Sequence, residues 1–439
     1  MGLHLFFIVL LVLAISARAF LKVPSNVPAG FVSKSENALS LEEMVRILQQ
    51  DVIEQNKISL DRFLPQQHVK LQKLLKELKE LDSFDTYPHD SIAFAVDSSK
   101  CSKEAWYEKY FYYLISQAVS QHENGFDPFA IHKFERLTNR PTAKYIEDVA
   151  YKLIEFVDVD VSDTNQLKSQ LSTLLEVCLW SSQAQVLAMT STENDPDNNG
   201  NSNIGLSSNK KRRAGFNNWI RRNRKHILND DIDTIVDQLV ILQEQKEDRC
   251  VDIIVDKCGA SLIADLLLGH VLLTYKLVTK VRYHTSAYSD RPDSVTNIDI
   301  SGHCEHLADP TKSQDIWAIR HFGEALKKHV LMNEFEFIEG LFWCQPQPFW
   351  DMPQHIQSRI QDSKMVFVKG DANYRRLLGE RDWPMDTPAS DILSYWPVPV
   401  CALRTFESNN VGCGLNAKQQ SVLIDPVKAS SYGIIQFKP

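Results

Sequence analysis

The 439-residue sequence lacks several patterns that would indicate a function directly. Its eight cysteines contain no C-x-x-C pair, so they do not resemble a zinc site. They are too widely scattered for a small disulfide scaffold, although their even number permits disulfides in a secreted protein. No Asn-x-Ser/Thr sequon occurs, so we expect no N-linked glycan. The net charge of −8 disfavours a nucleic-acid partner, whose phosphates are neutralised by Lys and Arg.

Long hydrophobic runs are also absent, except for one near the N-terminus. Leu5 to Ile15 is apolar and is followed by Ala17-Arg18-Ala19, a small-x-small cleavage pattern. This pattern predicts a signal peptide over residues 1–19 and a secreted protein with no membrane partner once the signal is removed. The alternative, a membrane anchor, requires roughly 20 apolar residues, which this run does not reach.

Residues 20–190 are predicted to form a mainly helical domain. Ser40 and Glu43 have capping-box spacing at the start of SLEEMVRILQQDVIEQ. The segments HVKLQKLLKELKELDSF and EAWYEKYFYYLISQAVSQ continue with the apolar periodicity of helices. Few strand candidates occur in this part of the chain.

Residues 191–225 are predicted to form a flexible loop with a basic cluster. The stretch STENDPDNNGNSNIGLSS is poor in apolar residues and rich in Asn, Ser and Gly. Two basic runs follow it, at Lys210–Arg213 and at Arg221–Lys225. Such runs are often only solvated loops. The alternative is a cleavage site at Lys210–Arg213 for a processing protease of the secretory pathway, since exposed loops are the segments that proteases cut.

Residues 226–439 alternate between short strand patterns and helical patterns. The strand candidates are VDIIV, KVRYH, MVFV, VPVCALR and YGIIQF, and helical stretches such as IWAIRHFGEALKKHVLM lie between strands. This alternation predicts an α/β domain with a largely parallel sheet, and we expect the candidate site to lie there.

Polar residues follow three of these strand candidates. Asp256 follows the first, and Gly259 permits a tight turn before a long apolar helix. The second leads into Lys369, Gly370 and Asp371, with Asn373, Tyr374 and Arg375 close behind, and the third into Arg404 and Thr405. Strand ends in open α/β sheets are common ligand sites, so these residues could hold a phosphate, a metal ion, or both. An Asp in this position is also often only a helix cap.

Together the segments resemble a known family, the damage-control phosphatases, and specifically the subfamily that acts on sugar phosphates. The resemblance runs over most of the mature chain and is carried by GFDPFAIHKFERL, LEVCLW, VDIIVDKCGASLIADLLLGHVLL, FWCQPQPFWDMP, VKGDANYRRLLGERDWP, VPVCALRT and YGIIQF. It implies a helical domain packed on a Rossmann-like α/β domain. It also implies an ancestral phosphomonoester hydrolase that uses Mn²⁺, Co²⁺ or a similar divalent ion.

The resemblance implies a metal site that this sequence alters. Asp256 matches the first metal ligand, but the family's following Asn falls on Lys257. The family's second Asp falls on Ser294 in a gapless comparison, and Asp293 beside it could substitute only if the strand shifts by one residue, which reverses side-chain direction. An ammonium cannot bind a metal ion. We therefore expect that Lys257 occupies the former metal region and pairs with Asp256, with Glu407, or with both.

The implied substrate side is retained in part. The catalytic candidates are Asp256 and Asp371, and the substrate-binding candidates are Asp256, Lys257, Gly370, Asp371, Ala372, Asn373, Tyr374 and Glu407. Glu407 replaces the phosphate-facing Lys of the family's Arg-Thr-x-Lys signature, and Trp180-Ser181-Ser182 replaces its Trp-Gly-Asn. The family is also linked with a carboxyl methyltransferase activity that uses S-adenosylmethionine, for which the sequence shows no Gly-rich cofactor loop.

Three functions remain open at this point. The first is a secreted phosphatase relative with lost or altered catalysis and a residual pocket for a small phosphorylated ligand. The second is an active metal-dependent phosphatase that hydrolyses sugar phosphates such as fructose 1-phosphate. The third is a processed, secreted interaction protein in which the basic loop is the functional part.

Overall fold

The computed structural model describes residues 23–24, 26–31, 39–58, 65–81, 98–157, 159–184, 216–245, 248–311, 317–407 and 412–439. The predicted signal peptide and the Lys210–Arg213 cluster lie outside the described residues. Within these ranges no helix has both the length and the apolar character needed to cross a membrane. All eight cysteines are described, and all are free thiols.

A seven-stranded sheet organises the C-terminal half of the chain. Its strands are β1 (Ile227–Asp230), β2 (Cys250–Ile254), β3 (Lys280–Ser286), β4 (Phe335–Gly340), β5 (Met365–Lys369), β6 (Val400–Thr405) and β7 (Gly433–Lys438). Their order is β1-β7-β6-β5-β2-β3-β4, and only the β6–β7 pair is antiparallel. The predicted α/β class and largely parallel sheet are confirmed. Each of the five strand candidates lies on a strand, whereas β1 and β4 were not predicted.

Helices cover both faces of the sheet, because successive strand residues point to opposite sides. In β5, Phe367 joins one hydrophobic core while Val366 and Val368 join another. The Phe367 face is covered by α9 (Arg140–Val157), α10 (Thr164–Trp180), α13 (Ile232–Gln243), α14 (Ala260–Thr274), α15 (Asn297–Ala308) and α16 (Trp317–Leu331). The opposite core includes side chains of α17 (Gln354–Gln361) and α18 (Asp371–Leu377), and the short helices α19 (Ala389–Ile392), α20 (Ala417–Val422) and α21 (Pro426–Ala429) lie late in the chain.

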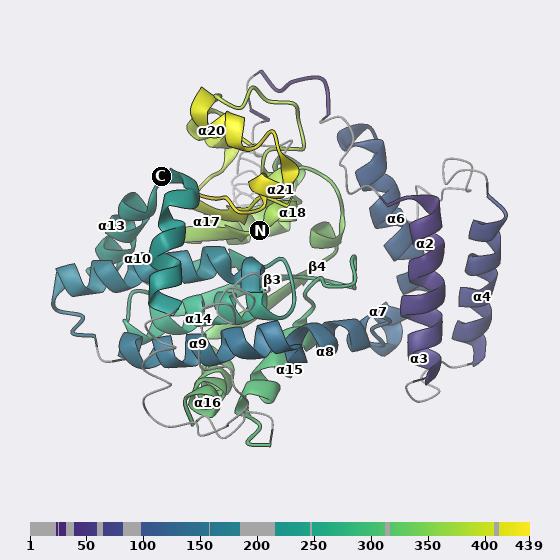
Figure 1. Ribbon diagram of the computed structural model, residues 1–439, viewed down its shortest axis with the longest axis horizontal. Coiled ribbons are helices and arrows are strands. Elements are labelled where there is room, and N and C mark those ends of the chain that lie inside the picture. The colour runs from purple at the N-terminus through teal and green to yellow at the C-terminus, as the bar shows by residue number, and fades with distance from the viewer. Residues whose placement is uncertain are drawn as a thin grey trace, which may run out of the picture.

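The earlier helices form a third hydrophobic core. Its members come mainly from α2 (Leu41–Arg46), its π-helical continuation η1 (Ile47–Glu54), α4 (Pro65–Lys79) and α6 (Lys103–Ala118). The short helix α3 (Gln55–Ile58) continues η1, and α7 (Gln121–Asn124) and α8 (Ala130–Thr138) follow α6, with Leu137 of α8 in the core on the Phe367 face of the sheet. Ser40 caps α2 by accepting a hydrogen bond from the backbone of Glu43 at 3.1 Å. Leu48, Leu71 and Phe111 are among the fully buried side chains of this core. Figure 1 shows α2, α3, α4 and α6 grouped at one end of the molecule, with α7 and α8 leading towards the sheet.

The helices of the predicted N-terminal domain therefore belong to two cores. Those up to α7 pack mainly with one another, whereas α9 and α10 pack on the sheet and share its larger core. The domain boundaries proposed from composition stay predictions.

Candidate functional site

The polar residues that follow β2 and those that follow β5 meet at the carboxyl ends of these neighbouring strands. Strand β2 pairs with β5, so that Ile254 lies opposite Val368, and Asp256 follows β2 while Gly370 follows β5. The Gly370 backbone has a φ of +85°, and a Cβ atom placed there would lie 1.9 Å from Oδ2 of Asp256. Only glycine permits both this backbone conformation and this close approach. Gly370 therefore makes room for the Asp256 carboxylate.

Lys257 forms an ion pair with Glu407, which is one of the two pairings expected from the sequence. The Lys257 backbone also forms an antiparallel bridge to Ser294, which brings together the two positions where the family places metal ligands. Burial opposes the charge on Lys257, but Glu407, Asp293 and Asp256 raise the pKa of this ammonium above its ordinary value. Lys257 is therefore a fixed positive charge in the region that the resemblance assigned to a metal ion.

Arg291 is a second cation at the same place, and sequence reasoning missed it. Its Nη2 donates to Oδ1 of Asp256 at 2.7 Å and to the Asp256 carbonyl at 3.1 Å. Asp293 lies 3.9 Å from Nε of Arg291 and 3.5 Å from Nη1 of Arg136. Although burial raises the pKa of the Asp293 carboxyl, the neighbouring Lys257, Arg291 and Arg136 lower it to about 2. The only hint in the sequence was the position of Arg291 beside the candidate Asp293.

This donor set does not fit a divalent metal ion. Mn²⁺ and similar ions are bound by several oxygen or nitrogen ligands that are free to point at one centre. Here the Asp256 and Asp293 carboxylates are each engaged with a guanidinium, and the Lys257 ammonium replaces an amide oxygen. In the part of the chain that the structure describes, no group of three His, Cys, Asp or Glu side chains is arranged to hold a metal.

The Asp371 carboxylate is also held by cations. Its Oδ1 accepts a hydrogen bond from Nε of Arg404 at 2.7 Å, and its Oδ2 accepts one from Nε of Arg375 at 3.1 Å. Burial works against the charge, but these two guanidinium groups hold the pKa of Asp371 below its ordinary value. Asp371 therefore stays an ionised anchor for two arginines.

Two other substrate candidates have structural partners. Asn373 donates to the carbonyls of Val255 and Lys369 at 2.9 and 3.0 Å, which joins the ends of β2 and β5. The buried Tyr374 hydroxyl donates to Oε1 of Gln436 at 2.6 Å, and the Arg404 guanidinium lies 4.7 Å from the centre of its ring.

A cleft of about 70 Å³ opens beside these residues. Of the predicted site residues, Asp256, Ala372 and Asn373 line it, together with the unpredicted Arg291 and His284. Lys257, Gly370, Asp371, Tyr374 and Glu407 lie outside its lining. Helix α6 supplies one wall through Glu104, Glu108 and Lys109, and nothing in their helical pattern indicated that they would face the sheet.

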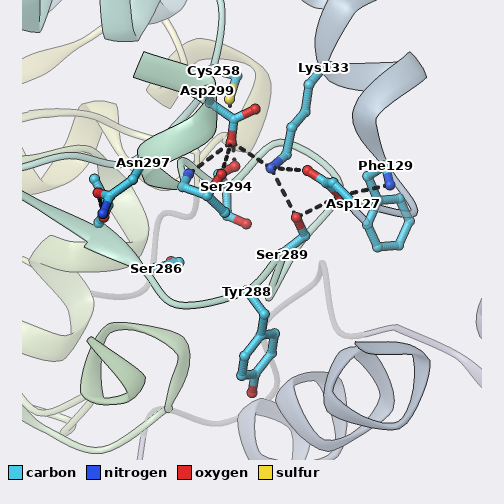
Figure 2. Close-up of polar contacts among 12 residues, drawn as sticks. Asp127, Phe129, Lys133, Cys258, Ser286, Tyr288, Ser289, Ser294, Asn297 and Asp299 are labelled. Carbon is cyan, nitrogen blue, oxygen red and sulfur yellow. Dashed lines mark hydrogen bonds and ion pairs between the residues drawn. The ribbon is translucent and has the colours of Figure 1, made fainter. Parts of the chain in front are cut away.

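A buried lysine fixes the loop that carries Arg291 and Asp293. Lys133 on α8 lies 2.7 Å from carboxylate oxygens of both Asp127 and Asp299 and donates to Oγ of Ser289 at 2.9 Å (Figure 2). Burial opposes its charge, but the two carboxylates raise the pKa of Lys133 above its ordinary value. Asp299 in turn accepts from the backbone of Thr296 at 2.8 Å. Lys133 therefore ties α8 to both ends of the loop.

Sequence comparisons with known proteins agree with the family resemblance. Residues 40–422 match the sequence model of the damage-control phosphatase ARMT1-like domain. The mouse protein named damage-control phosphatase ARMT1 is 27% identical over 75% of this chain and 73% of its own, and the rat protein of the same name is 26% identical over the same shares. A solved structure of a DUF89 family protein from Pyrococcus horikoshii aligns with 10% identity and a TM-score of 0.41, over 85% of this chain and 95% of that one.

Proposed function

The chain belongs to the damage-control phosphatase ARMT1-like family, and we propose that the metal-dependent phosphoester hydrolysis implied by this family is lost or altered in it while a cleft for a small ligand is retained. The ligand class that the family suggests is a small phosphorylated molecule. The implied metal, Mn²⁺ or Co²⁺, has no fitting ligand set among the described residues.

One observation carries this proposal: two fixed cations occupy the region that the resemblance assigns to the metal ion. Lys257 pairs with Glu407, and Arg291 pairs with Asp256 at 2.7 Å. A divalent metal polarises the phosphoryl group and activates the attacking water. Lys257 and Arg291 supply positive charge but no open coordination position, so they can neutralise an anion without activating a water molecule. An incoming divalent ion would have to break both ion pairs and would meet repulsion from both cations.

The test is turnover of fructose 1-phosphate and para-nitrophenyl phosphate with and without Mn²⁺ or Co²⁺. The natural protein is compared with a revertant that carries Lys257→Asn, Ser294→Asp and Glu407→Lys, and with a second revertant that adds Arg291→Leu. Lys276→Asn, Ser301→Asp and Glu324→Lys make a control with the same residue changes at exposed positions outside the cleft.

We expect no metal-stimulated turnover from the natural protein or the control and metal-stimulated turnover from a revertant. Metal-dependent hydrolysis by the natural protein would overturn the proposal and favour the alternative, an active phosphatase that uses Asp256 and Asp293. If every variant is silent, titration with Mn²⁺ decides, because only the revertants should bind the ion.

Secretion belongs to the same proposal and is supported by the apolar run and the cleavage pattern before Phe20. Processing at Lys210–Arg213 is supported only by the basic cluster itself. N-terminal sequencing of protein collected from the medium of expressing cells tests both. A start at Phe20 supports the signal peptide, and a second start just after Arg213 supports the cleavage.

A further inference from the structure

The cleft lies between two parts of the molecule that are packed separately. One wall is α6, which contributes to the third hydrophobic core, and the facing wall holds residues beyond the strand ends, such as Asp256 and Ala372. The buried members of the third core lie between Met44 and Phe129, and among the described residues none of them belongs to the cores that flank the sheet. We call the described residues from 39 to 129 the cap (Figure 1).

The cleft is small for the kind of ligand that the family suggests. Its volume is about 70 Å³. Pockets that enclose small molecules usually measure roughly 300–1,000 Å³. The sheet side of the cleft is held in place, because Asn373 joins the ends of β2 and β5 through two hydrogen bonds. The cap is the wall whose movement would enlarge the cleft, so the structure corresponds to a closed form.

The cap holds three consecutive residues that follow β3, which are Tyr288, Ser289 and Asp290. The Lys109 ammonium on α6 forms an ion pair with Asp290, and both side chains are largely buried. Nε2 of Gln121 on α7 donates to Oγ of Ser289 at 3.4 Å, and the backbone N–H of Ser289 donates to Oε1 of Gln121 at 3.3 Å. These contacts fix the cap against the sheet beside the cleft.

Other contacts across the same boundary are polar or involve single rings. The centre of the Tyr288 ring lies 5.2 Å from that of His122 and 6.2 Å from that of Tyr113. Ser102 donates to Oε2 of Glu380 at 3.5 Å. Because the two parts have separate cores, the cap can leave this boundary without taking a side chain out of either core. Relative motion is the expected behaviour of two such parts unless their interface is large and apolar.

The segment that the cap holds continues directly into the candidate site. Arg291 follows Asp290 and donates to Oδ1 and to the carbonyl of Asp256 at 2.7 and 3.1 Å. On the other side, Ser286 at the end of β3 donates to Oδ1 of Asp290 at 2.8 Å, a bond that does not involve the cap. The position of the cap is therefore linked through adjacent residues to a cation of the implied metal region.

The junction between the cap and α8 is the place about which the cap can turn. The described chain passes from the cap to the sheet at Phe129, where α8 begins. Lys133 on α8 lies 2.7 Å from carboxylate oxygens of both Asp127, at the end of the cap, and Asp299 on α15. This network keeps the junction attached to the sheet, so a rotation there moves α6 and α7 and leaves α8 in place.

We propose that the cap is a gate to the cleft. It rotates away from the strand ends to admit a ligand, and the contacts of Lys109 with Asp290 and of Gln121 with Ser289 are the latches that hold it shut. The inference rests on the proposed function in one respect only, the retention of a ligand cleft. Opening requires neither a metal ion nor any hydrolysis.

The access of a bulky thiol reagent to the cleft tests the gate in the full chain. Ala372→Cys places a reporter thiol at a half-buried position of the cleft lining. Its modification by biotin-maleimide without denaturant is followed for each cysteine-containing peptide by mass spectrometry. Two natural thiols report unfolding, because Cys101 is 3% exposed in the cap core and Cys401 is fully buried in a core of the sheet.

The latch variants are made in this reporter background. Lys109→Met removes a latch cation and leaves the Asp290 carboxylate without it until the cap opens and water reaches the charge. Lys76→Met is the matched control, since the pair of Lys76 with Glu80 is largely exposed and lies within the cap. Gln121→Ala breaks the second latch and decides the test if Lys109→Met does not fold.

We expect both latch variants to raise the modification rate of the Ala372→Cys thiol. For Lys109→Met the increase should be about tenfold, the equivalent of one charge-assisted hydrogen bond in the opening equilibrium. Lys76→Met should leave the rate unchanged. Cys101 and Cys401 should stay unmodified in every variant, because the cap moves as a folded unit.

Three results would overturn the gate. Equal rates in all variants would mean that the latch contacts do not control access. Modification of Cys101 together with the reporter would mean that the cap unfolds instead of rotating. A reporter that reacts in the natural background as fast as in the urea-unfolded chain would mean that the cleft is already open. Metal-dependent turnover by the natural protein, by contrast, would overturn the proposed function and leave the gate standing.

Discussion

Single residues decide how close the two central motifs can come. Asp256 is nearly fully buried, and its carboxylate occupies the space where any side chain at position 370 would begin. Gly370 at the same time starts α18 with a positive φ that other residues adopt only under strain. Position 370 therefore needs both a positive φ and the absence of a side chain, so no other residue fits between the ends of β2 and β5.

Gly370→Ala should destabilise the protein by about 3 kcal/mol, because backbone strain and the displaced Asp256 carboxylate act together. Urea unfolding followed by circular dichroism measures the loss. Gly302→Ala is the matched control, since Gly302 lies on α15 with no atom within 4 Å of its added Cβ. That exchange should stabilise the helix by about 0.5–1 kcal/mol. Equal effects of the two exchanges would contradict the close approach.

At the scale of elements, one side chain joins a helix to the loop that carries the cations. Lys133 is 2% exposed and is the shared partner of Asp127 and Asp299. Such a buried ion network contributes little net stability compared with apolar packing, but breaking it leaves uncompensated charge. Its importance here lies in fixing residues 289–299 relative to α8.

Lys133→Met should cost about 3–5 kcal/mol, because two buried carboxylates lose their shared cation. The free energy of unfolding in urea at neutral pH measures this cost. Lys168→Met is the comparison, since Lys168 pairs with Asp237 at 2.6 Å but both side chains are largely exposed, and its loss should cost at most about 1 kcal/mol. A Lys133→Met cost as small as that of Lys168→Met would mean that the network is dispensable.

The whole molecule is built from separate cores. The core formed mainly by α2, η1, α4 and α6 shares no residue with the two cores that flank the sheet. The cleft lies where these parts meet, and contacts such as Lys109 with Asp290 cross it. Separate cores of unequal size unfold locally at different free energies.

Hydrogen exchange followed by mass spectrometry should therefore show faster exchange in α4 than in β2 and β5 at neutral pH. Leu74→Ala, in the smaller core, should accelerate exchange in α2, α4 and α6 and leave the sheet unchanged, whereas Leu266→Ala should accelerate exchange in the sheet. The two leucines are 5% and 0% exposed, so they are matched in burial. Uniform acceleration by Leu74→Ala would show a single cooperative unit instead.

Local sequence patterns were enough to predict the α/β class, five of the strands, the cap of α2 and the family. These features follow from local patterns, because a buried strand requires a run of apolar residues and a cap requires particular side chains at fixed spacing. The pairing of Lys257 with Glu407 was also among the predictions, since a Lys replaces the family's neutral Asn at one motif position and a Glu replaces its Lys at another.

The side chains that fill the site could not be predicted from local patterns, because tertiary packing brings them there. Arg291, His284 and the acidic face of α6 reach the cleft through packing between segments far apart in the chain, and no local pattern marks them. The partners of the buried Asp252, which are Arg282 and His284 on β3, likewise follow from the pairing of β2 with β3 and from no local pattern. Side-chain direction at such positions depends on which elements pack together, and that is fixed by the burial of the whole chain rather than by the neighbouring residues.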